Sequence, residues 1–339
     1  MSLQFIMGNS GSGKSYCLYD TVVREAIENP DKNYLVIVPE QFTMQTQKDL
    51  CLAHPKGGIM NIDVLSFGRL AYRVFEEVGQ DARVVLDDEG KNLVLRKIAG
   101  ECEKDLKVFK GNLKKQGYIS EVKSVLSEFA QYGVDFERLD DFMKEVPPES
   151  YLHYKLDDIR TIYEKFEEYL SEKYITKEEM LDVLSDAVPY SDILKGSVVA
   201  MDGFTGFTPV QNRLIGELFS VCEKVMITVT MDGRENPYVY EHPYQIFALG
   251  KQMVTSLMKI AGEKKTEIEE PICLFERPVY RFRDCSEMAF LETELFRYSG
   301  AKYNGSCESV SLHEVRSPGK EAKYVAESIR RLVRTKGYR

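Results

Sequence analysis

Continuous apolar runs alternate with helix-like segments in the first part of the chain. The run Leu3–Met7 predicts a strand, and residues 14–28 predict a helix after a glycine-rich loop. Two further runs, Tyr34–Val38 and Ile62–Phe67, predict strands, and the second leads into a helix at about 68–78. Because continuous apolar strands that alternate with helices are typical of a parallel sheet covered on both faces, we predict an α/β fold.

The pattern changes between residues 87 and 185. Strand-like runs disappear, the segment is rich in lysine and glutamate, and apolar residues such as Leu95 and Ile98 recur at helical spacing. We interpret this segment as a large all-helical insertion.

The sheet pattern resumes after the insertion. Ser197–Met201 and Lys224–Thr230 predict strands, with a helix over 209–221 between them. In the last part of the chain we predict a polar connector at 263–285. A short strand over Ser309–Val315 and a helix over about Gly319–Thr335 are predicted to follow.

Composition narrows the class of protein. The chain of 339 residues is 43% apolar and 29% charged, as in globular proteins, and its net charge of −9 argues against a wholly basic nucleic-acid coat. No apolar run approaches the roughly 18 residues of a membrane helix, and no signal peptide is evident, so we expect a cytoplasmic protein with no membrane partner. The seven cysteines form no C-x-x-C pair, which favours reduced thiols over a metal cluster.

A phosphate-binding loop is the strongest chemical signal. The segment GNSGSGKS fits the pattern G-x-x-x-x-G-K-[ST] and lies between a predicted strand and a predicted helix. Its backbone N–H groups would surround phosphates, Lys14 would reach the β- and γ-phosphates of ATP, and Ser15 would bind Mg²⁺. The candidate nucleotide-binding residues are Gly8, Asn9, Ser10, Gly11, Ser12, Gly13, Lys14 and Ser15.

A second candidate motif follows the strand that ends at Met201. An aspartate at this position, Asp202, is where a phosphate-loop NTPase holds Mg²⁺. The next residue is usually a glutamate that activates the attacking water, but here it is Gly203. Glycine cannot act as a base, so we expect slow or absent hydrolysis. A structural turn after the strand is the alternative interpretation.

The spacing of this motif favours one class of NTPase. Superfamily 1 helicases carry D-E-x-Q-D-x-x-x-x-Q here, and Asp202 and Gln211 stand nine positions apart, as the first and last letters do in that pattern. The letters between them include Gly203, Thr205 and Gly206. The segment therefore resembles a helicase motif that has lost its catalytic residues.

Two other segments follow strands at the same expected edge of the sheet. VPEQFT contains Gln41 and Thr43, which can hydrogen-bond bases, and VLSFGRLAYR contains aromatic residues and Arg69. Such side chains suit single-stranded DNA, because aromatic rings stack on bases and arginine binds phosphates or base edges. Taken singly, each also suits a packed phenylalanine or a solvated arginine.

Six lysines in the insertion form a further candidate. Several fall three or four positions apart, so they can share a helix face, either as a solvated surface or as a strip that follows phosphates. They are Lys104, Lys107, Lys110, Lys114, Lys115 and Lys123.

Taken together and in this order, GNSGSGKS, VPEQFT, VLSFGRLAYRVF and VAMDGFTGFTPVQ resemble the AddB family, which forms one half of the bacterial AddAB helicase–nucleases. The resemblance implies a superfamily 1, RecA-like fold and a partner subunit of the AddA type. It also implies a helicase-like half that scans single-stranded DNA for the Chi recombination signal. The DNA-binding positions that it implies are Gln41, Thr43, Phe67, Arg69, Tyr72, Phe204 and Phe207.

The resemblance also implies a longer protein. Family members carry a nuclease domain and a [4Fe–4S] cluster in a C-terminal part that is not readable here, so we expect an N-terminal fragment. The predicted parts are domain 1A in two pieces, the insertion between them, and a connector with the start of a second helicase-like domain. Their ranges are 1–86 and 191–265, 87–190, and 266–339.

Two departures from conventional superfamily 1 helicases weaken the expected affinity for nucleotide. The first strand begins at about Leu3, which leaves no room for an upstream glutamine motif, and the arginines of a second domain would lie beyond residue 339. A stand-alone phosphate-loop kinase or NTPase, and a structural scaffold that binds a partner, are the alternative functions.

Overall fold

The computed structural model describes residues 1–79, 83–113, 115–170 and 173–338. The chain divides into two compact units, Met1–Glu276 and Arg277–Arg339, and each is described by itself.

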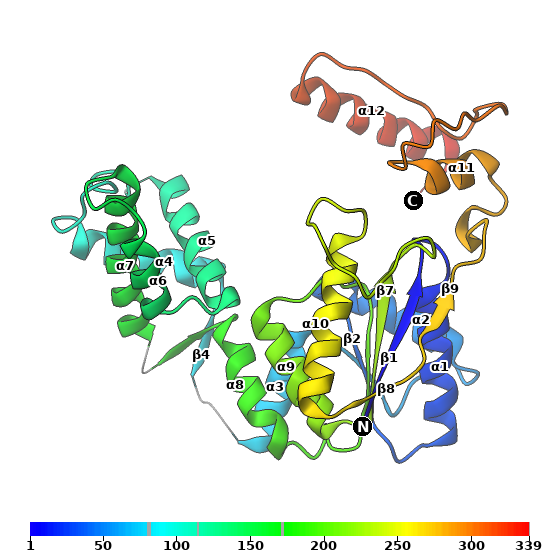
Figure 1. Ribbon diagram of the computed structural model, residues 1–339, viewed down its shortest axis with the longest axis horizontal. Coiled ribbons are helices and arrows are strands. Elements are labelled where there is room, and N and C mark those ends of the chain that lie inside the picture. Colours follow the sequence, from blue (N-terminus) through cyan, green and yellow to red (C-terminus); the bar gives the residue numbers. More distant parts are fainter. Residues whose placement is uncertain (80–82, 114, 171–172, 339) are drawn as a thin grey trace. The chain divides into compact units, whose positions relative to one another are not determined.

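A parallel sheet of seven strands forms the centre of the first unit (Figure 1). Its order is β3-β2-β6-β7-β1-β8, and β9 also pairs with β1. All of these pairs are parallel, which confirms the predicted α/β class. The strands are β1 (Ser2–Gly8), β2 (Tyr34–Ile37), β3 (Ile62–Leu65), β6 (Val198–Met201), β7 (Lys224–Thr230), β8 (Glu267–Ile268) and β9 (Ile272–Leu274).

The strand register brings the candidate motifs to one edge. Ile37 of β2 is paired with Leu65 of β3 on one side and with Met201 of β6 on the other. The backbone N–H of Asp202 donates to the carbonyl of Ile37 at 3.1 Å. Because all these strands end together, the segments that follow them start side by side, as expected at the carboxyl edge of a parallel sheet.

Helices cover both faces of this sheet (Figure 1). On one face lie α1 (Lys14–Glu28) and α2 (Thr43–Ala53), and on the other lie α3 (Phe67–Val78), α8 (Glu179–Ala187), α9 (Pro209–Val221) and α10 (Ala248–Lys264). In β1, Phe5 and Met7 face one core and Ile6 faces the other. Full burial of each such side chain contributes about 1.5–3 kcal/mol, so these two cores hold the motif-bearing edge rigidly.

Local signals fix where two of the helices begin. Thr208 accepts from the backbone N–H of Gln211, and the Gln211 side chain accepts from the N–H of Thr208 at 2.9 Å, which forms a capping box before α9. Ser66 caps α3 by accepting from the N–H of Arg69. The helix predicted over 209–221 is confirmed with those bounds.

The segment between β3 and β6 contains a separate helical bundle with its own apolar core. Its elements are β4 (Val84–Leu86), α4 (Asp88–Cys102), α5 (Gln116–Tyr132), α6 (Phe136–Lys144), α7 (Tyr151–Leu170) and β5 (Tyr174–Thr176). The short strand β5, which pairs parallel with β4, was not predicted. The following helix, α8, packs into the core of the sheet instead of the bundle core.

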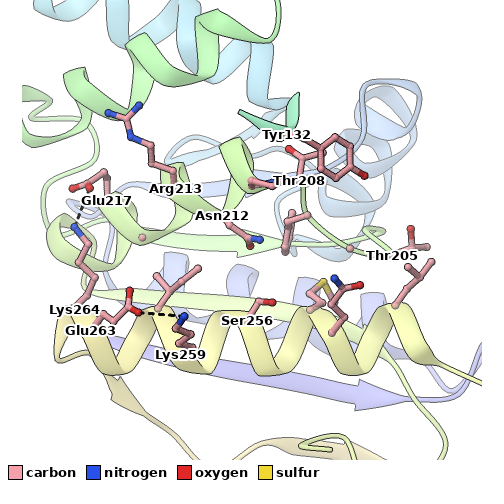
Figure 2. Close-up of a pocket in the computed structure, with 18 residues that line it drawn as sticks. Tyr132, Thr205, Thr208, Asn212, Arg213, Glu217, Ser256, Lys259, Glu263 and Lys264 are labelled. Carbon is pink, nitrogen blue, oxygen red and sulfur yellow. Dashed lines mark hydrogen bonds and ion pairs between the residues drawn. The ribbon is translucent and has the colours of Figure 1, made fainter. Parts of the chain in front are cut away.

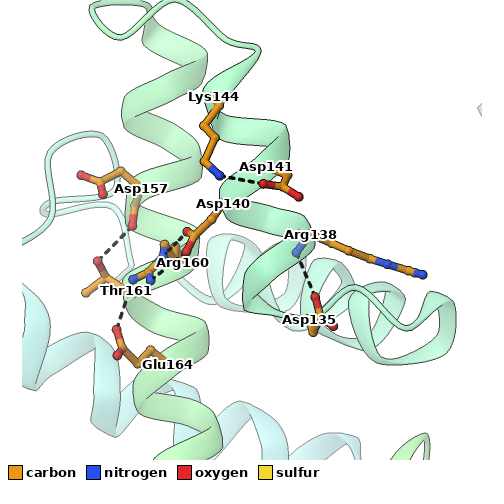
Figure 3. Close-up of polar contacts among 9 residues, drawn as sticks. All are labelled: Asp135, Arg138, Asp140, Asp141, Lys144, Asp157, Arg160, Thr161 and Glu164. Carbon is orange, nitrogen blue, oxygen red and sulfur yellow. Dashed lines mark hydrogen bonds and ion pairs between the residues drawn. The ribbon is translucent and has the colours of Figure 1, made fainter.

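Polar contacts tie α6 to α7 in this bundle (Figure 3). Arg160 of α7 forms ion pairs with Asp140 of α6 and with Glu164 one turn further along α7. Asp135 caps α6 by accepting from the backbone N–H of Arg138 at 2.9 Å. The ion pairs orient the two helices but add little stability, because water and salt screen charges at the surface.

The predicted helical face of lysines is wrong for the lysines between α4 and α5. Residues 103–113 form turns, and the Asp158 carboxylate holds them by accepting backbone N–H groups, including that of Val108 at 2.7 Å. Lys107 is paired with Asp157 at 2.9 Å. Lys104, Lys110 and Lys115 lie in the same turn region, Lys123 lies on α5, and Lys114 lies outside the described residues.

The second unit contains α11 (Ser286–Glu294) and α12 (Pro318–Lys336), so the predicted final helix is confirmed. The predicted strand at Ser309–Val315 is wrong, because those residues form no regular element. The Glu287 carboxylate accepts the backbone N–H groups of Glu308 and Ser309, each at 2.7 Å, so Glu287 occupies donors at the start of that segment that a strand would use in a ladder. Short 3₁₀ helices occur at Glu40–Phe42 and Val188–Tyr190 in the first unit and at Tyr280–Phe282 in the second.

Candidate functional site

The phosphate loop connects β1 to α1. Gly11 has φ 86° and Gly13 has φ 96°, both in the left-handed region that favours glycine. Gly13 stands at the N-terminus of α1, where backbone N–H groups have no partner in the helix. Alternating left-handed residues followed by a helix N-terminus make a concave nest for an anion. The loop has the backbone geometry of a phosphate site.

The other residues of the loop are placed around this nest. Asn9 is buried, whereas Ser10 and Ser15 are exposed. The Ser12 hydroxyl is buried without a hydrogen-bond partner among the described residues. An orphaned buried hydroxyl at this position is a group that a ligand oxygen can satisfy.

Lys14 closes the loop. Its ammonium group donates to the carbonyl oxygens of Gly8 at 3.0 Å and Asn9 at 2.9 Å. A bound phosphate would compete for these donors, because anions form stronger charge-assisted hydrogen bonds than carbonyls do. Gly8 has no room for a side chain, since an added Cβ would lie 2.3 Å from the Ser12 Oγ and 2.8 Å from the Leu274 carbonyl.

Asp202 lies at the end of β6 and is buried, with 7% of its surface exposed. Its Oδ1 accepts the hydroxyl of Thr228 in β7 at 2.6 Å, and its Oδ2 accepts the hydroxyl of Tyr19 in α1 at 2.8 Å. The Tyr19 hydroxyl also lies 3.2 Å from the Thr46 Oγ1 in α2. Burial, and then the charge of Asp202, raise the pKa of Tyr19, so the phenol stays protonated as a donor. A network of hydroxyls thus surrounds this carboxylate.

The arrangement does not fit a magnesium ion held by Asp202. Mg²⁺ requires near-octahedral oxygen ligands at about 2.0–2.1 Å, so a carboxylate oxygen must be accessible to it. Each oxygen of Asp202 already accepts one hydroxyl hydrogen bond, and the group is buried, so an ion or one of its waters would have to displace a hydroxyl or open this packing to reach it. In the described part of the chain, no group of three or more histidine, cysteine, aspartate or glutamate side chains is placed to hold a metal ion.

Gly203 occupies the position of the catalytic glutamate in related motifs. Its φ is +79°, and a Cβ added there would lie 3.5 Å from Pro39 and 3.7 Å from Phe42. Space is therefore not the obstacle to a side chain. The left-handed backbone is the obstacle, because it costs about 1–2 kcal/mol for an ordinary residue. A side chain at position 203 would therefore meet backbone strain and not a steric clash.

The VPEQFT segment forms a turn at the carboxyl edge, beside the start of α3. Gln41 is exposed, whereas Thr43 is buried and donates to the carbonyl of Glu40 at 3.0 Å. The Arg69 Nε lies 3.2 Å from the Glu40 carboxylate, and both side chains are more than half exposed. Tyr72, one turn along α3 from Arg69, is 56% exposed. Gln41, Arg69 and Tyr72 are therefore accessible to a ligand.

Three aromatic residues of the same region pack against one another. Phe67 is buried, and the centroid of its ring lies 5.4 Å from the ring centroid of Phe204 and 6.4 Å from that of Phe207. The ring centroids of Phe204 and Phe207 lie 5.1 Å apart, and both residues are half-buried. Phe67 therefore supports the surface from below, and the other two rings lie between the core and solvent.

A groove of about 790 Å³ lies between α9 and α10, beyond the loop 205–209 (Figure 2). Its cations are paired: Lys264 with Glu217 at 2.9 Å, and Lys259 with Glu263 at 3.9 Å. Arg213 is paired with two aspartates of α8. These ion pairs lower the positive charge that the groove presents to a phosphate backbone.

Sequence reasoning missed several residues of the site. Tyr19 and Thr228 hold Asp202, Glu40 pairs with Arg69, and Phe42, 48% exposed, lies beside Gly203. Tyr19 carried one available signal, since it stands four residues after Ser15 and therefore shares its face of α1. No local pattern indicated Thr228, because its hydrogen bond to Asp202 joins residues 26 positions apart.

The parallel sheet, the nest after β1 and the buried aspartate at the end of β6 define a phosphate-loop protein with a RecA-like fold. No helix of the described chain is long and apolar enough to cross a membrane.

Comparison with known proteins places the chain more narrowly. Residues 5–292 match the family described as ADDB, N-terminal, and the chain belongs to this family. It is 42% identical over 343 residues to the B subunit of the ATP-dependent helicase/deoxyribonuclease of Lachnoclostridium phytofermentans, with 100% of this chain and 30% of the relative covered. The proteins of the same name from Clostridium tetani and Clostridium kluyveri are 33% and 34% identical, with 100% of this chain and 30% and 29% of their lengths covered. The chain thus spans about 30% of the length of these curated relatives.

Proposed function

We propose that this chain is the DNA-scanning, helicase-like part of a subunit that processes broken DNA ends in recombinational repair. In this proposal it recognises a Chi-type signal in single-stranded DNA and acts in the cytoplasm, where bacterial DNA lies. Its partner is a second helicase–nuclease subunit of the AddA type, which supplies the motor. The membership of the ADDB, N-terminal family and the names of the relatives support this assignment.

The observation that carries the proposal is the backbone at Gly203. Gly203 stands where a motor protein has its catalytic base. Its φ is +79°, and it lies beside Phe42 of the VPEQFT turn. A glycine cannot activate water, so the nucleotide site binds ATP without efficient turnover. This feature also disfavours a stand-alone kinase or NTPase, which would need a base beside the phosphate loop.

The DNA-facing surface in this proposal is the exposed part of the same edge. Tyr72 supplies a ring for stacking, Arg69 a cation and Gln41 an amide that can hydrogen-bond a base. Phe204 and Phe207 are proposed to contact the strand from the half-buried side of the surface, while Phe67 and Thr43 hold the surface in place from within.

The experiment is a single-molecule measurement of DNA unwinding by the full-length protein with its partner subunit. Complexes carrying Arg69→Ala or Gln41→Ala are expected to pause less often at the recognition sequence, with an unchanged unwinding rate. The rate is unchanged because the motor lies in the partner. Pausing equal to that of the wild-type complex in both variants would contradict the proposed DNA-scanning role.

A further inference from the structure

The environment of Asp202 bears on how the phosphate loop binds nucleotide. Its two carboxylate oxygens accept the hydroxyl hydrogens of Tyr19 and Thr228 at 2.8 and 2.6 Å. In a magnesium-dependent site, a carboxylate at this place faces the ion that also binds the serine or threonine after the lysine. Here two neutral hydroxyl donors occupy that carboxylate.

Tyr19 lies on α1, the helix that follows the phosphate loop, and this helix places it beside Asp202. It stands four residues after Ser15, and residues four apart lie on one face of a helix. The tyrosine is buried, and its hydroxyl lies between Asp202 of β6 and Thr46 of α2. A cation that approached Asp202 would have to displace this hydroxyl from a site that water does not readily reach.

We propose that the Tyr19 hydroxyl takes the place of a metal ion at Asp202, so that the loop binds free nucleotide with little dependence on Mg²⁺. Lys14 and the backbone N–H groups of the nest then supply the positive field for the phosphates. Tyr19 is a positioning residue that acts through Asp202 and does not touch the nucleotide. This inference rests on the nucleotide-binding part of the proposed function.

The test is a titration of the full-length protein with methylanthraniloyl-ATP, once in excess magnesium and once in EDTA. The wild-type dissociation constants are expected to agree within about threefold, which is well under 1 kcal/mol. Tyr19→Phe keeps the ring but frees the Oδ2 of Asp202 for a cation, so affinity in magnesium is expected to exceed that in EDTA by about tenfold. Tyr16→Phe is the matched control, because Tyr16 is 75% exposed on the same helix, and it should behave as wild type.

The outcomes separate the two claims. Wild-type affinity that falls tenfold or more in EDTA, with Asp202→Asn removing the effect, would overturn the inference and leave nucleotide binding intact. A Tyr19→Phe variant with the wild-type ratio would overturn the role of Tyr19. The absence of binding in both buffers would overturn the proposed nucleotide-binding function, and the inference with it. A merely structural Tyr19 would change affinity equally in both buffers.

Discussion

Two regions at one edge of the sheet differ in whether their polar side chains are hydrogen-bonded inside the protein or exposed to solvent. At the phosphate loop, Lys14 binds backbone carbonyls and Asp202 is surrounded by hydroxyls from two neighbouring elements. At the VPEQFT turn and the start of α3, Arg69 and Tyr72 are more than half exposed. The first region holds Lys14 and Asp202 in internal hydrogen bonds, although the Ser12 hydroxyl has no partner among the described residues. The second region exposes Tyr72 and Arg69, and Arg69 is paired with the exposed Glu40.

Residues that keep the spacing of a helicase motif can therefore also have structural roles. Asp202 and Gln211 retain helicase spacing, yet Asp202 joins α1 to β7 and Gln211 caps α9. Each residue still has a physical reason to be there. The retained spacing does not require that the site hydrolyses ATP.

The largest expected effect is on the free energy of unfolding, and it distinguishes a buried residue that supports the surface from an exposed residue on it. Phe67→Ala should lower the free energy of unfolding by about 3–5 kcal/mol, because it empties a buried aromatic site. Tyr72→Ala, one turn further along α3 and exposed, should change it by less than about 0.5 kcal/mol. Urea unfolding measures both. Equal losses would mean that Tyr72 is a core residue and not part of an accessible surface.

The next effect concerns the phosphate loop. Lys14→Ala should weaken ATP binding by about 1.5–3 kcal/mol, since it removes a charged donor to the phosphates. Its thermal unfolding should stay close to that of the wild type, because the Lys14 ammonium donates to carbonyls within the loop itself. Calorimetric titration measures the affinity. An unchanged dissociation constant would show that the loop does not bind nucleotide through Lys14.

The third effect tests the exposed region. Tyr72→Ala should weaken single-stranded DNA binding by about 1–3 kcal/mol, the usual contribution of one stacked base. Tyr190→Ala is the matched control, because Tyr190 is 70% exposed but lies away from the carboxyl edge. Fluorescence anisotropy with a labelled oligonucleotide compares them. If both variants lose the same affinity, the DNA surface does not lie where we propose.

A smaller effect is expected at the degenerate motif. Gly203→Glu should lower the free energy of unfolding by about 1–2 kcal/mol because of the left-handed backbone. It should not produce ATP turnover, since the glutamate cannot adopt the geometry of a catalytic base there. Gly206→Ala, where an added Cβ meets nothing within 4 Å, is the control. Rapid hydrolysis by Gly203→Glu would mean that only the side chain had been lost.

A pH-dependent effect distinguishes two carboxylates that are shielded from water in different ways. Burial, and then the charge of Glu179, raise the pKa of Glu167 to about 7, whereas hydroxyls satisfy Asp202. Because the folded state favours protonated Glu167, its contribution to stability is present at low pH and is lost as pH rises through 7. Urea midpoints at mildly acidic and mildly alkaline pH should show this decline. Glu167→Gln should reduce it, and an identical decline in that variant would exclude Glu167 as its source.

The sequence predicted the elements whose signals are local. The helix over 209–221 was found with its bounds because Thr208, Pro209 and Gln211 mark its start. The strand over 224–230 was found because its apolar run is continuous. Such signals lie within a few residues of the element that they define.

Elements that depend on distant partners were missed or misplaced. The strand β8 has two residues and exists only because it pairs with β1, and the strand predicted at Ser309–Val315 is absent from that segment. The helix α10 was not predicted at all. At the site, the loop was predicted from its spacing, but the hydrogen bond between Tyr19 and Asp202 joins residues 183 positions apart. No local pattern encodes such a contact.

The fate of bound ATP tests most directly whether the nucleotide site has lost its turnover. Full-length protein, purified without its partner, is incubated with γ-labelled ATP, and the bound nucleotide is isolated and quantified as ATP or ADP over time. We expect it to remain ATP, because Gly203 provides no base and hydroxyls occupy Asp202. Continuing conversion to ADP with release of phosphate, abolished by Lys14→Ala, would contradict a site without turnover.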